Sequence, residues 1–192
     1  MFGLRMLAIK IHSRNAKMAD NELATAKQRR DFVYGNHTCV VSYARKASPP
    51  SMSIVHYVMD DDKIVFLTMA DRQKAKAVRR NNQLSICVLD GPQGGLSWPP
   101  EYLVVDGIAE IVPDVEFVVA RAMEVGPIMM GQPVPPEAET MVREMMIREN
   151  RVAICVTPQS TFHSPSVHPE ADGADAAEKM VHGLGARLPW SV

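Results

Sequence analysis

The hydrophobic and polar positions along the chain predict short strands interrupted by helices. Apolar runs rich in β-branched residues, some alternating with polar positions, are typical of strands. Six such runs occur, at residues 38–43, 52–58, 63–69, 84–89, 102–112 and 151–157. Apolar side chains at helical spacing are typical of amphipathic helices. They predict four helices, at residues 22–33, 71–81, 113–125 and 137–150.

The segments between these elements carry turn residues. Proline or glycine occurs in three connections that are expected to be loops, at residues 45–50, 91–100 and 127–136. Residues 60–62 are three aspartates, and a solvated hairpin turn is the main interpretation. The alternative, a calcium loop, needs oxygen ligands at alternate positions and a later glutamate. Gly107 indicates a β-bulge or a close backbone approach inside a strand, and Pro158 is expected to stop the last strand.

The order of the predicted elements indicates the fold class. Adjacent strands joined by short turns favour a mainly β, α+β chain over a doubly wound sheet. An antiparallel barrel with helices at its ends fits this order. The sequence contains neither a dinucleotide-binding glycine pattern nor a phosphate-binding loop. One domain is expected, at residues 21–160, followed by an irregular tail at 161–192.

The N-terminal extension, residues 1–20, is expected to lie outside the barrel. Its first seventeen residues are basic and contain no acid, and no small-residue cleavage site follows them. We interpret the extension as a disordered tail or as the product of an over-long translation start, since Met18, Ala19 and Asp20 look like an ordinary beginning.

Charge and composition narrow the function classes. The chain has 192 residues, 46% of them hydrophobic, with 21 basic and 22 acidic side chains. This balance gives no overall field to attract nucleic acid or an anionic membrane, so an anion site must be local. Three scattered cysteines, Cys39, Cys87 and Cys155, are interpreted as buried thiols in a reducing cytoplasm. No metal site is expected, since His163 and His168 lack partners at useful spacing, and no run approaches the roughly 20 apolar residues of a membrane-spanning helix.

The segment around residues 64–86 carries the candidate chemistry. Thr68 ends a predicted strand, and Arg72 and Lys74 stand at the start of the following helix. A hydroxyl, two cationic side chains and the unpaired amides of a helix start together suit a phosphate group. On spacing alone, the alternative of a solvated basic helix face is the stronger one.

Four segments resemble the flavin and deazaflavin oxidoreductase superfamily, whose fold is the split β-barrel of the pyridoxamine-phosphate-oxidase type. IVFLTMADRQKAKAVRRNNQLSICVLD resembles its strand, Thr or Ser, Arg-x-Lys, short helix, Arg-Arg-Asp-Pro and strand signature. SMSIVHYVMDDDKIVFLT resembles its second strand, acidic hairpin and third strand. EYLVVDGIAEIV is similar to its long strand, and RVAICVTPQ to its final strand. Together the segments span about residues 29–159.

The resemblance implies a homodimer with two cofactor sites between the subunits. It implies that Thr68, Arg72 and Lys74 hold the phosphate or phosphodiester tail, and that the ring lies against the strand at 53–57. The further cofactor-binding positions are then Ser53, Val55, Tyr57 and Met69. Two departures from the pattern occur. Asn81 and Asn82 stand where Asp-Pro or Asn-Pro is usual, and Ala77 replaces a frequent amide side chain.

Some aromatic, histidine and methionine side chains have two interpretations each. His56 is a candidate proton donor, but on an alternating strand it equally points outward. Trp98 either covers a planar ring or packs as an ordinary tryptophan. Six methionines either line a substrate pocket or fill a core or dimer seam: Met123, Met129, Met130, Met141, Met145 and Met146.

The expected function is an oxidoreductase that transfers a hydride between a cofactor and a small organic substrate. Coenzyme F420 is favoured over FMN, because the Thr68-to-Lys74 run resembles the deazaflavin branch. Hydride transfer needs orientation more than acid–base chemistry, so the lack of a catalytic triad is consistent with it. Two alternatives stay open. One is a non-catalytic flavin, haem or tetrapyrrole binding protein on the same barrel, and the other is a structural dimer with a vacant cleft.

Overall fold

The computed structural model describes residues 25–89, 102–163 and 187–191. Four α-helices and one short 3-10 helix lie in these ranges: α1 (Ala26–Gly35), α2 (Gln73–Arg80), α3 (Val115–Met130), η2 (Pro136–Ala138) and α4 (Glu139–Arg148). The strands are β1 (Thr38–Tyr43), β2 (Ser51–His56), β3 (Val58–Asp60), β4 (Lys63–Met69), β5 (Gln83–Leu89), β6 (Tyr102–Val112), β7 (Arg151–Phe162) and β8 (Leu188–Pro189).

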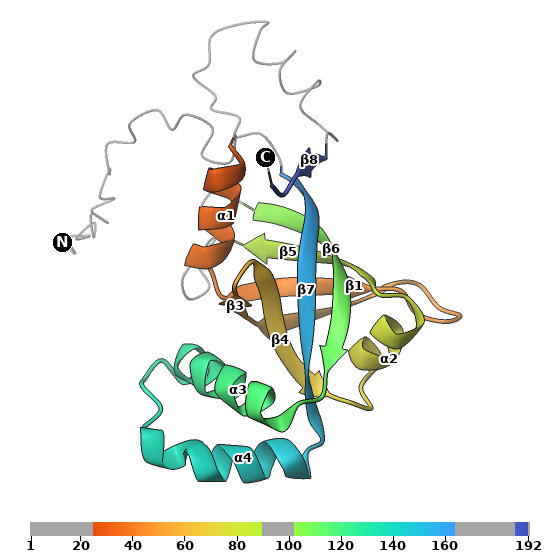
Figure 1. Cartoon of the computed structure of the whole chain (residues 1–192). Helices are drawn as coiled ribbons and strands as arrows, with labels where there is room; N and C mark the ends of the chain where they lie inside the picture. Colours follow the sequence, from red (N-terminus) through yellow and green to blue (C-terminus); the bar gives the residue numbers. More distant parts are fainter. Residues whose placement is uncertain (1–24, 90–101, 164–186, 192) are drawn as a thin grey trace, which may run out of the picture.

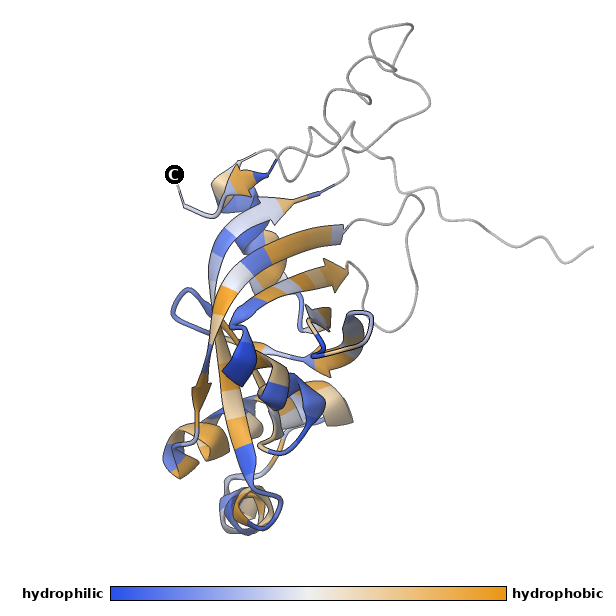
Figure 2. Ribbon diagram, turned by 90° about the vertical axis from the view of Figure 1, so that its right-hand side faces the viewer, coloured by the Kyte–Doolittle hydropathy of each residue, from blue (hydrophilic) through white to orange (hydrophobic). Residues whose placement is uncertain are grey.

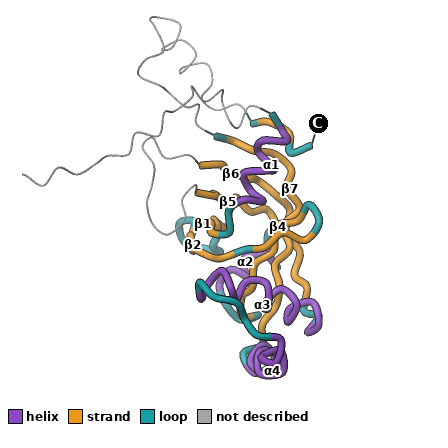
Figure 3. Tube along the Cα trace, turned by 90° about the vertical axis from the view of Figure 1, so that its left-hand side faces the viewer, coloured by secondary structure: helices purple, strands orange, loops and turns teal. Residues whose placement is uncertain are grey.

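The strands form one antiparallel sheet that curls into a half-barrel. Its order is β2-β1-β5-β6-β7-β4-β3, and β8 pairs with β7. Figures 1 and 3 show α1 at one end of this sheet and the α3–α4 pair at the other, with α2 at its side. The predicted class, a mainly β split barrel with helices at its ends, is confirmed.

The sheet separates two hydrophobic clusters. The larger one fills the curl of the sheet and includes Tyr57, Phe66 and Ile86. The smaller one packs α3 and α4 against the other face, around Val65 and Val118. Figure 2 shows the hydrophobic positions in orange along the strands. Met146 is buried in the smaller cluster and Met123 and Met145 pack against it, whereas Met129, Met130 and Met141 are exposed.

Two local predictions are confirmed. Asp61 occupies the turn between β3 and β4 with φ 50°, so the three aspartates form a hairpin turn. At Gly107 the register between β6 and β7 shifts, and a Cβ there would lie 2.6 Å from Val156 Cγ1 and 2.8 Å from the Thr157 carbonyl oxygen. Gly107 therefore marks both a β-bulge and a close backbone approach.

The predicted strand at 52–58 is divided in the structure. β2 pairs with β1, whereas β3 pairs with β4 on the opposite edge of the sheet. Tyr57 lies between them: its backbone N–H donates to the His37 carbonyl at 2.9 Å, and its hydroxyl donates to the Val33 carbonyl at 2.7 Å. These two bonds attach the chain to the end of α1 where it leaves one strand partner for another.

The expected loop at 127–136 and the expected stop at Pro158 are both wrong in part. α3 continues through Pro127 and ends at Met130. The next residue, Gly131, forms a left-handed cap, with a φ of 66° and an N–H bond to the Pro127 carbonyl. β7 continues through Pro158 to Phe162. Proline has no backbone N–H to donate to a neighbouring strand. The strand tolerates Pro158 because, on one side of β7, the pairing with β4 reaches only Val156 and the pairing with β8 begins at Ser160.

The far end of the chain is ordered where the structure describes it. Residues 187–191 contain β8, and Trp190 is 5% exposed within the larger cluster. The Trp190 N–H donates to the Gln159 carbonyl at 3.1 Å, and Arg29 donates to the Pro189 carbonyl at 3.1 Å. The expectation of an irregular tail at 161–192 is therefore wrong for residues 187–191. The domain limits themselves stay a prediction, because residues 1–24 and 164–186 lie outside the described residues.

Candidate functional site

Thr68 and the start of α2 meet at the turn that follows β4. Thr68 is 3% exposed at the end of β4, and no hydrogen bond of its hydroxyl occurs among the described residues. Arg72 is the N-cap of α2, and its N–H donates to the Met69 carbonyl at 3.1 Å. Arg79 donates to the Ala70 carbonyl at 2.6 Å and so braces the same turn.

The start of α2 is cationic and lacks a side-chain cap. Residues 71–80 contain five Lys or Arg and one Asp. The Arg72 side chain makes no cap hydrogen bond, and its Nε donates instead to Met69 Sδ at 3.4 Å. Lys74 is half-buried and has no ion pair within the described residues. Uncapped helix amides beside unpaired cations favour an anion.

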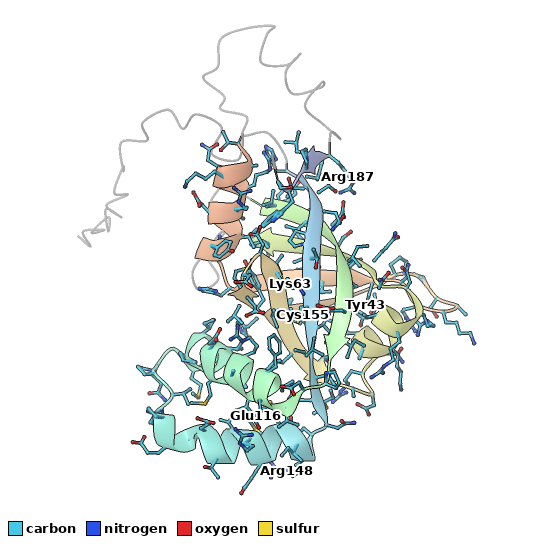
Figure 4. All side chains as sticks on the ribbon, viewed as in Figure 1. Tyr43, Lys63, Glu116, Arg148, Cys155 and Arg187 are labelled. Atoms are coloured by element: carbon cyan, nitrogen blue, oxygen red, sulfur yellow. The ribbon has the colours of Figure 1, made fainter. Side chains whose placement is uncertain are left out.

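Tyr43 lies near two of the predicted site residues, Ser53 and Lys74. Its hydroxyl lies 3.4 Å from Ser53 Oγ, and Tyr43 is 7% exposed. Hydrogen bonds with the hydroxyls of Ser51, the larger cause, and of Ser53 lower the pKa of the Tyr43 phenol. Burial opposes this effect, and the positive charges of Lys74 and Arg45 add to it. Figure 4 shows Tyr43 beside α2, the helix that carries Lys74.

The sequence analysis did not single out Tyr43. Its alternation with Cys39 and Val41 places it on the inward face of β1, but that pattern is shared by ordinary core tyrosines. The partners of Tyr43 come from β2 and α2, and only the folded register brings them together.

β2 is an edge strand that pairs with β1 alone. The half-buried Ser53 and Val55 share the inward face of β2 with Ser51. Met52 and Ile54 lie on the other face, 70% and 74% exposed. The predicted ring position at 53–57 thus includes two half-buried inward side chains and an unshared backbone edge.

The other predicted positions lie elsewhere. His56 follows the alternation of Met52 and Ile54 and lies opposite Thr38, whose Oγ1 is 3.0 Å from His56 Nδ1. The Tyr57 side chain is fully buried, and burial raises its pKa, so it belongs to the core. Ala77 is also buried there, and Asn81 Oδ1 accepts from the Gln83 N–H at 3.1 Å in the turn after α2. Trp98 lies outside the described residues.

A cleft of about 470 Å³ lies at the ends of β1 and β5. Its lining combines apolar surface with the polar residues Ser42, Gln83, Ser85, Asp106 and Gln159. Asp106 accepts from Ser85 Oγ at 2.6 Å and from Arg187, which precedes β8. Ser42, Ser85 and Asp106 face one another in register on the outward face of the sheet, opposite to the face that carries the Tyr43 side chain.

Next to this cleft, an apolar row crosses the outward face of the sheet. Its members face one another in register across five strands: Ile54, Val40, Cys87, Val104 and Phe162. None of them is fully buried. An apolar row of this length on a partly exposed sheet face is a feature of surfaces that pack against protein.

Burial raises the pKa of the Cys39 thiol to about 12 and that of Cys155 to about 11, so both stay protonated and are poor nucleophiles. Within residues 25–89, 102–163 and 187–191, no three His, Cys, Asp or Glu side chains gather to hold a metal ion. In the same ranges, every helix is too short or too polar to span a bilayer.

Comparison with known proteins identifies the fold. The family model described as pyridoxamine 5'-phosphate oxidase matches residues 25–163. The curated proteins contain no match. Among solved structures, the conserved hypothetical protein Rv2991 from Mycobacterium tuberculosis is 23% identical, with a TM-score of 0.63, covering 83% of this chain and 99% of that chain.

Two other solved structures share the fold at lower identity. A FAD-binding protein from Mesorhizobium loti is 17% identical with a TM-score of 0.52, covering 71% of this chain and 91% of that one. HutZ, the heme storage protein from Vibrio cholerae, is 14% identical with a TM-score of 0.53, covering 73% and 95%. At these identities the likeness shows the architecture alone.

Proposed function

Because the chain belongs to the pyridoxamine 5'-phosphate oxidase family, we propose that it is an oxidoreductase that binds a phosphate-bearing flavin or deazaflavin. The observation that carries this proposal is the meeting of Thr68, the uncapped start of α2 and Lys74 at one turn. Each of these groups donates hydrogen bonds or positive charge, and no carboxylate pairs with Lys74 among the described residues. A phosphate supplies the acceptor oxygens that such donors lack.

Different residues hold the tail and the ring of the cofactor. Thr68, Arg72 and Lys74 hold the phosphate or phosphodiester tail. The ring lies along the edge of β2, where Ser53 and Val55 face inward and the backbone has no second strand partner. Met69 would contact the tail beside Arg72, whose Nε donates to the Met69 sulfur.

Coenzyme F420 is the favoured cofactor, with FMN second. The Thr68, Arg72 and Lys74 run resembles the deazaflavin branch, and either tail presents phosphate oxygens to the same donors. The fold shared with a FAD-binding protein is consistent with a flavin-type ring.

The homodimer is part of the same proposal. The apolar row from Ile54 to Phe162 gives a second copy a surface to cover, and it adjoins the edge of β2. Two copies packed there place each β2 edge beside the partner subunit, so the ring is held between the subunits.

In this assignment the protein binds and orients, while the cofactor in its reduced form supplies the hydride. The β4–α2 turn, braced by the Arg79 hydrogen bond to the Ala70 carbonyl, would hold the tail, and β2 would hold the ring in one orientation. Orientation of this kind is the main requirement of hydride transfer.

The alternative function is storage or transport of a flavin, haem or tetrapyrrole without turnover. HutZ, a heme storage protein, shares the fold. A haem site needs an axial ligand, and His56 lies on the outward face of β2, hydrogen-bonded to Thr38. Within β2, His56 is therefore turned away from the predicted ring position.

Titration of the purified protein with F420, FMN and haem tests the proposal. We expect saturable binding of F420 or FMN, followed by oxidation of the bound reduced cofactor when an organic acceptor is added. Tight haem binding with no binding of either F420 or FMN would contradict the proposal and favour the storage function.

A further inference from the structure

Reduction by hydride transfer needs a proton as well as a hydride. When a hydride reaches one carbon of a polarised double bond, the electron pair of that bond moves to the neighbouring carbon or oxygen. That atom must then take a proton, and a positioned side chain that supplies it accelerates the reaction. Because the proposed dimer holds the ring between two copies, the side chains that can meet the ring include those of the partner subunit.

The outward face of the sheet is the surface that the partner subunit presents. The proposed dimer covers the apolar row from Ile54 to Phe162, and this row lies on the outward face. On β2 the same face carries Met52, Ile54 and His56. His56 and Ile54 are two residues apart, or about 7 Å along the strand. His56 therefore stands at the margin of the surface that a second copy covers.

His56 is held in place within its own subunit. It is half-buried, and its Nδ1 lies 3.0 Å from Oγ1 of Thr38, which faces it on β1. Whichever of the two atoms donates, this hydrogen bond occupies Nδ1. In the described part of the chain, His56 Nε2 has no hydrogen-bond partner. Thr38 thus orients the imidazole and leaves one nitrogen for a bound molecule.

Three other titratable side chains on the outward face lie in the apolar row or within two residues of it, among the described residues. Cys87 is in the middle of the row, and burial raises the pKa of its thiol. The Asp106 carboxylate accepts from Ser85 and from Arg187, so it serves as an acceptor. Tyr102 lies on β6, three strands or about 14 Å from β2. Imidazole is also the group that most often acts as a general acid in enzymes.

From this placement we infer that His56 is the proton donor of the reaction, and that it serves the cofactor held by the partner subunit. The inference rests on the proposed function. The Nε2–H bond of the His56 imidazolium breaks, and the proton bonds to the acceptor atom that received the electron pair. The hydride comes from the reduced cofactor, which is thereby oxidised. The neutral imidazole left on His56 then regains a proton from water.

The surroundings of His56 indicate the class of acceptor. Its neighbour on the outward face of β2 is the apolar Ile54, and its hydrogen-bond partner is the uncharged Thr38. An uncharged molecule with a polarised carbonyl, such as an enone or a quinone, matches one imidazole beside an apolar side chain. Hydride transfer to such a molecule leaves an oxyanion, which is the species that an imidazolium protonates.

Hybrid dimers distinguish a site within one subunit from a site shared by two. Lys74→Ala weakens the cofactor site of one subunit, and His56→Gln removes the acid from the other. The two full-length chains are co-expressed with different affinity tags, and purification on both tags isolates the hybrid. In this hybrid the cofactor is held by the His56→Gln subunit, and the remaining His56 belongs to the Lys74→Ala subunit. His37→Gln is the matched control, because His37 is an exposed histidine just before β1.

Modification by diethyl pyrocarbonate, which acylates accessible imidazoles, measures where the cofactor lies. Each dimer is first titrated with F420 and FMN. It is then treated with the reagent at a cofactor concentration that fills the wild-type site but not the Lys74→Ala site, and mass spectrometry follows His56 and His37. In the hybrid we expect the cofactor to slow the modification of His56 severalfold and to leave His37 unchanged. In the Lys74→Ala homodimer we expect no protection.

The rate of cofactor oxidation is the second measurement, with cyclohexenone and a quinone as acceptors. The His56→Gln homodimer is expected to oxidise its bound reduced cofactor about 10²–10⁴-fold more slowly than the wild type, and His37→Gln at the wild-type rate. The hybrid has one complete site out of two, so it is expected to keep about half of the wild-type rate.

A hybrid whose His56 reacts equally with and without cofactor, or which is as slow as the His56→Gln homodimer, overturns the inference while the cofactor site stands. A loss of rate in Tyr102→Phe in place of His56→Gln would move the donor to β6 and also overturn it. So would a chain that forms no hybrid dimer, or a wild type that binds cofactor but reduces neither acceptor. A wild type that binds neither cofactor contradicts the proposed function itself, and the titration shows this before any reagent is added.

Discussion

Arg187 donates to the carboxylate of Asp106 and so joins the segment before β8 to the middle of β6, 81 residues away in the sequence. Three residues later, Trp190 enters the core between the sheet and α1. The end of the chain is therefore part of the barrel, and the two contacts make different contributions.

Trp190→Ala is expected to destabilise the protein by about 3–5 kcal/mol, because it removes a large buried side chain from the core. Arg187→Ala removes a half-exposed ion pair and is expected to cost about 0–1 kcal/mol. Urea unfolding of both variants measures the difference. Equal, small losses in the two variants would mean that the C-terminal segment does not pack as described.

Gly107→Ala is expected to destabilise the protein by about 1–3 kcal/mol. The added Cβ meets the Thr157 carbonyl oxygen at 2.8 Å, and this backbone atom cannot move without disturbing the pairing of β6 and β7. Gly35→Ala is the control, since a Cβ at Gly35 has nothing within 4 Å. Thermal unfolding measures the stability of both variants. A Gly107→Ala protein as stable as Gly35→Ala would show that the strands separate easily at the bulge.

Lys74→Ala is expected to weaken binding of F420 or FMN by about 1.5–3 kcal/mol, the range for hydrogen bonds to charged groups. Lys76→Ala, an exposed position on the same helix, removes an equal charge and is expected to change the affinity far less. Cofactor titration and thermal unfolding of both variants separate binding from folding. The same small loss of cofactor affinity in both variants would mean that α2 presents only a solvated basic face.

The stability of the protein is expected to fall at alkaline pH, in part because of Cys39. Burial raises the Cys39 pKa to about 12, whereas an unfolded thiol ionises near about 8.5. The unfolded chain therefore loses this proton first, and the thiol's contribution is complete below about pH 8.5 and lost as the pH rises toward about 12. The slope is up to about 1.4 kcal/mol per pH unit for one group.

Urea unfolding at about pH 8 and about pH 10, on wild type and on Cys39→Ala, measures this contribution. The variant is expected to be less stable at the lower pH but to lose less stability between the two. An identical loss in both proteins would mean that Cys39 does not titrate differently on unfolding.

The sequence predicted most elements because their signals are local. The alternation in β1 and β4, the three aspartates of the turn and the glycine at the bulge each act within a few residues. The predictions failed where a distant partner decides the outcome. Tyr57 divides a single apolar run because it bonds to His37 and Val33, and Pro158 is tolerated because β4 ends before it.

The residues of the candidate site likewise differ in whether a local sequence pattern or a distant partner identifies them. Thr68, Arg72 and Lys74 are neighbours in the sequence, and their pattern identified them. Tyr43 is far from them, and a tyrosine at the end of an alternating strand has no local mark of function. The register of β1 with β2 places its hydroxyl by Ser53, and the packing of α2 brings Lys74 near.

The central claim is that the start of α2 holds the phosphate of a cofactor. The affinities of FMN and riboflavin, which differ in that phosphate alone, test it most directly on the wild-type protein. The account predicts that FMN binds at least about tenfold more tightly than riboflavin, and that Lys74→Ala removes most of the difference. Equal affinities of the wild type for FMN and riboflavin, with F420 not bound, would contradict it.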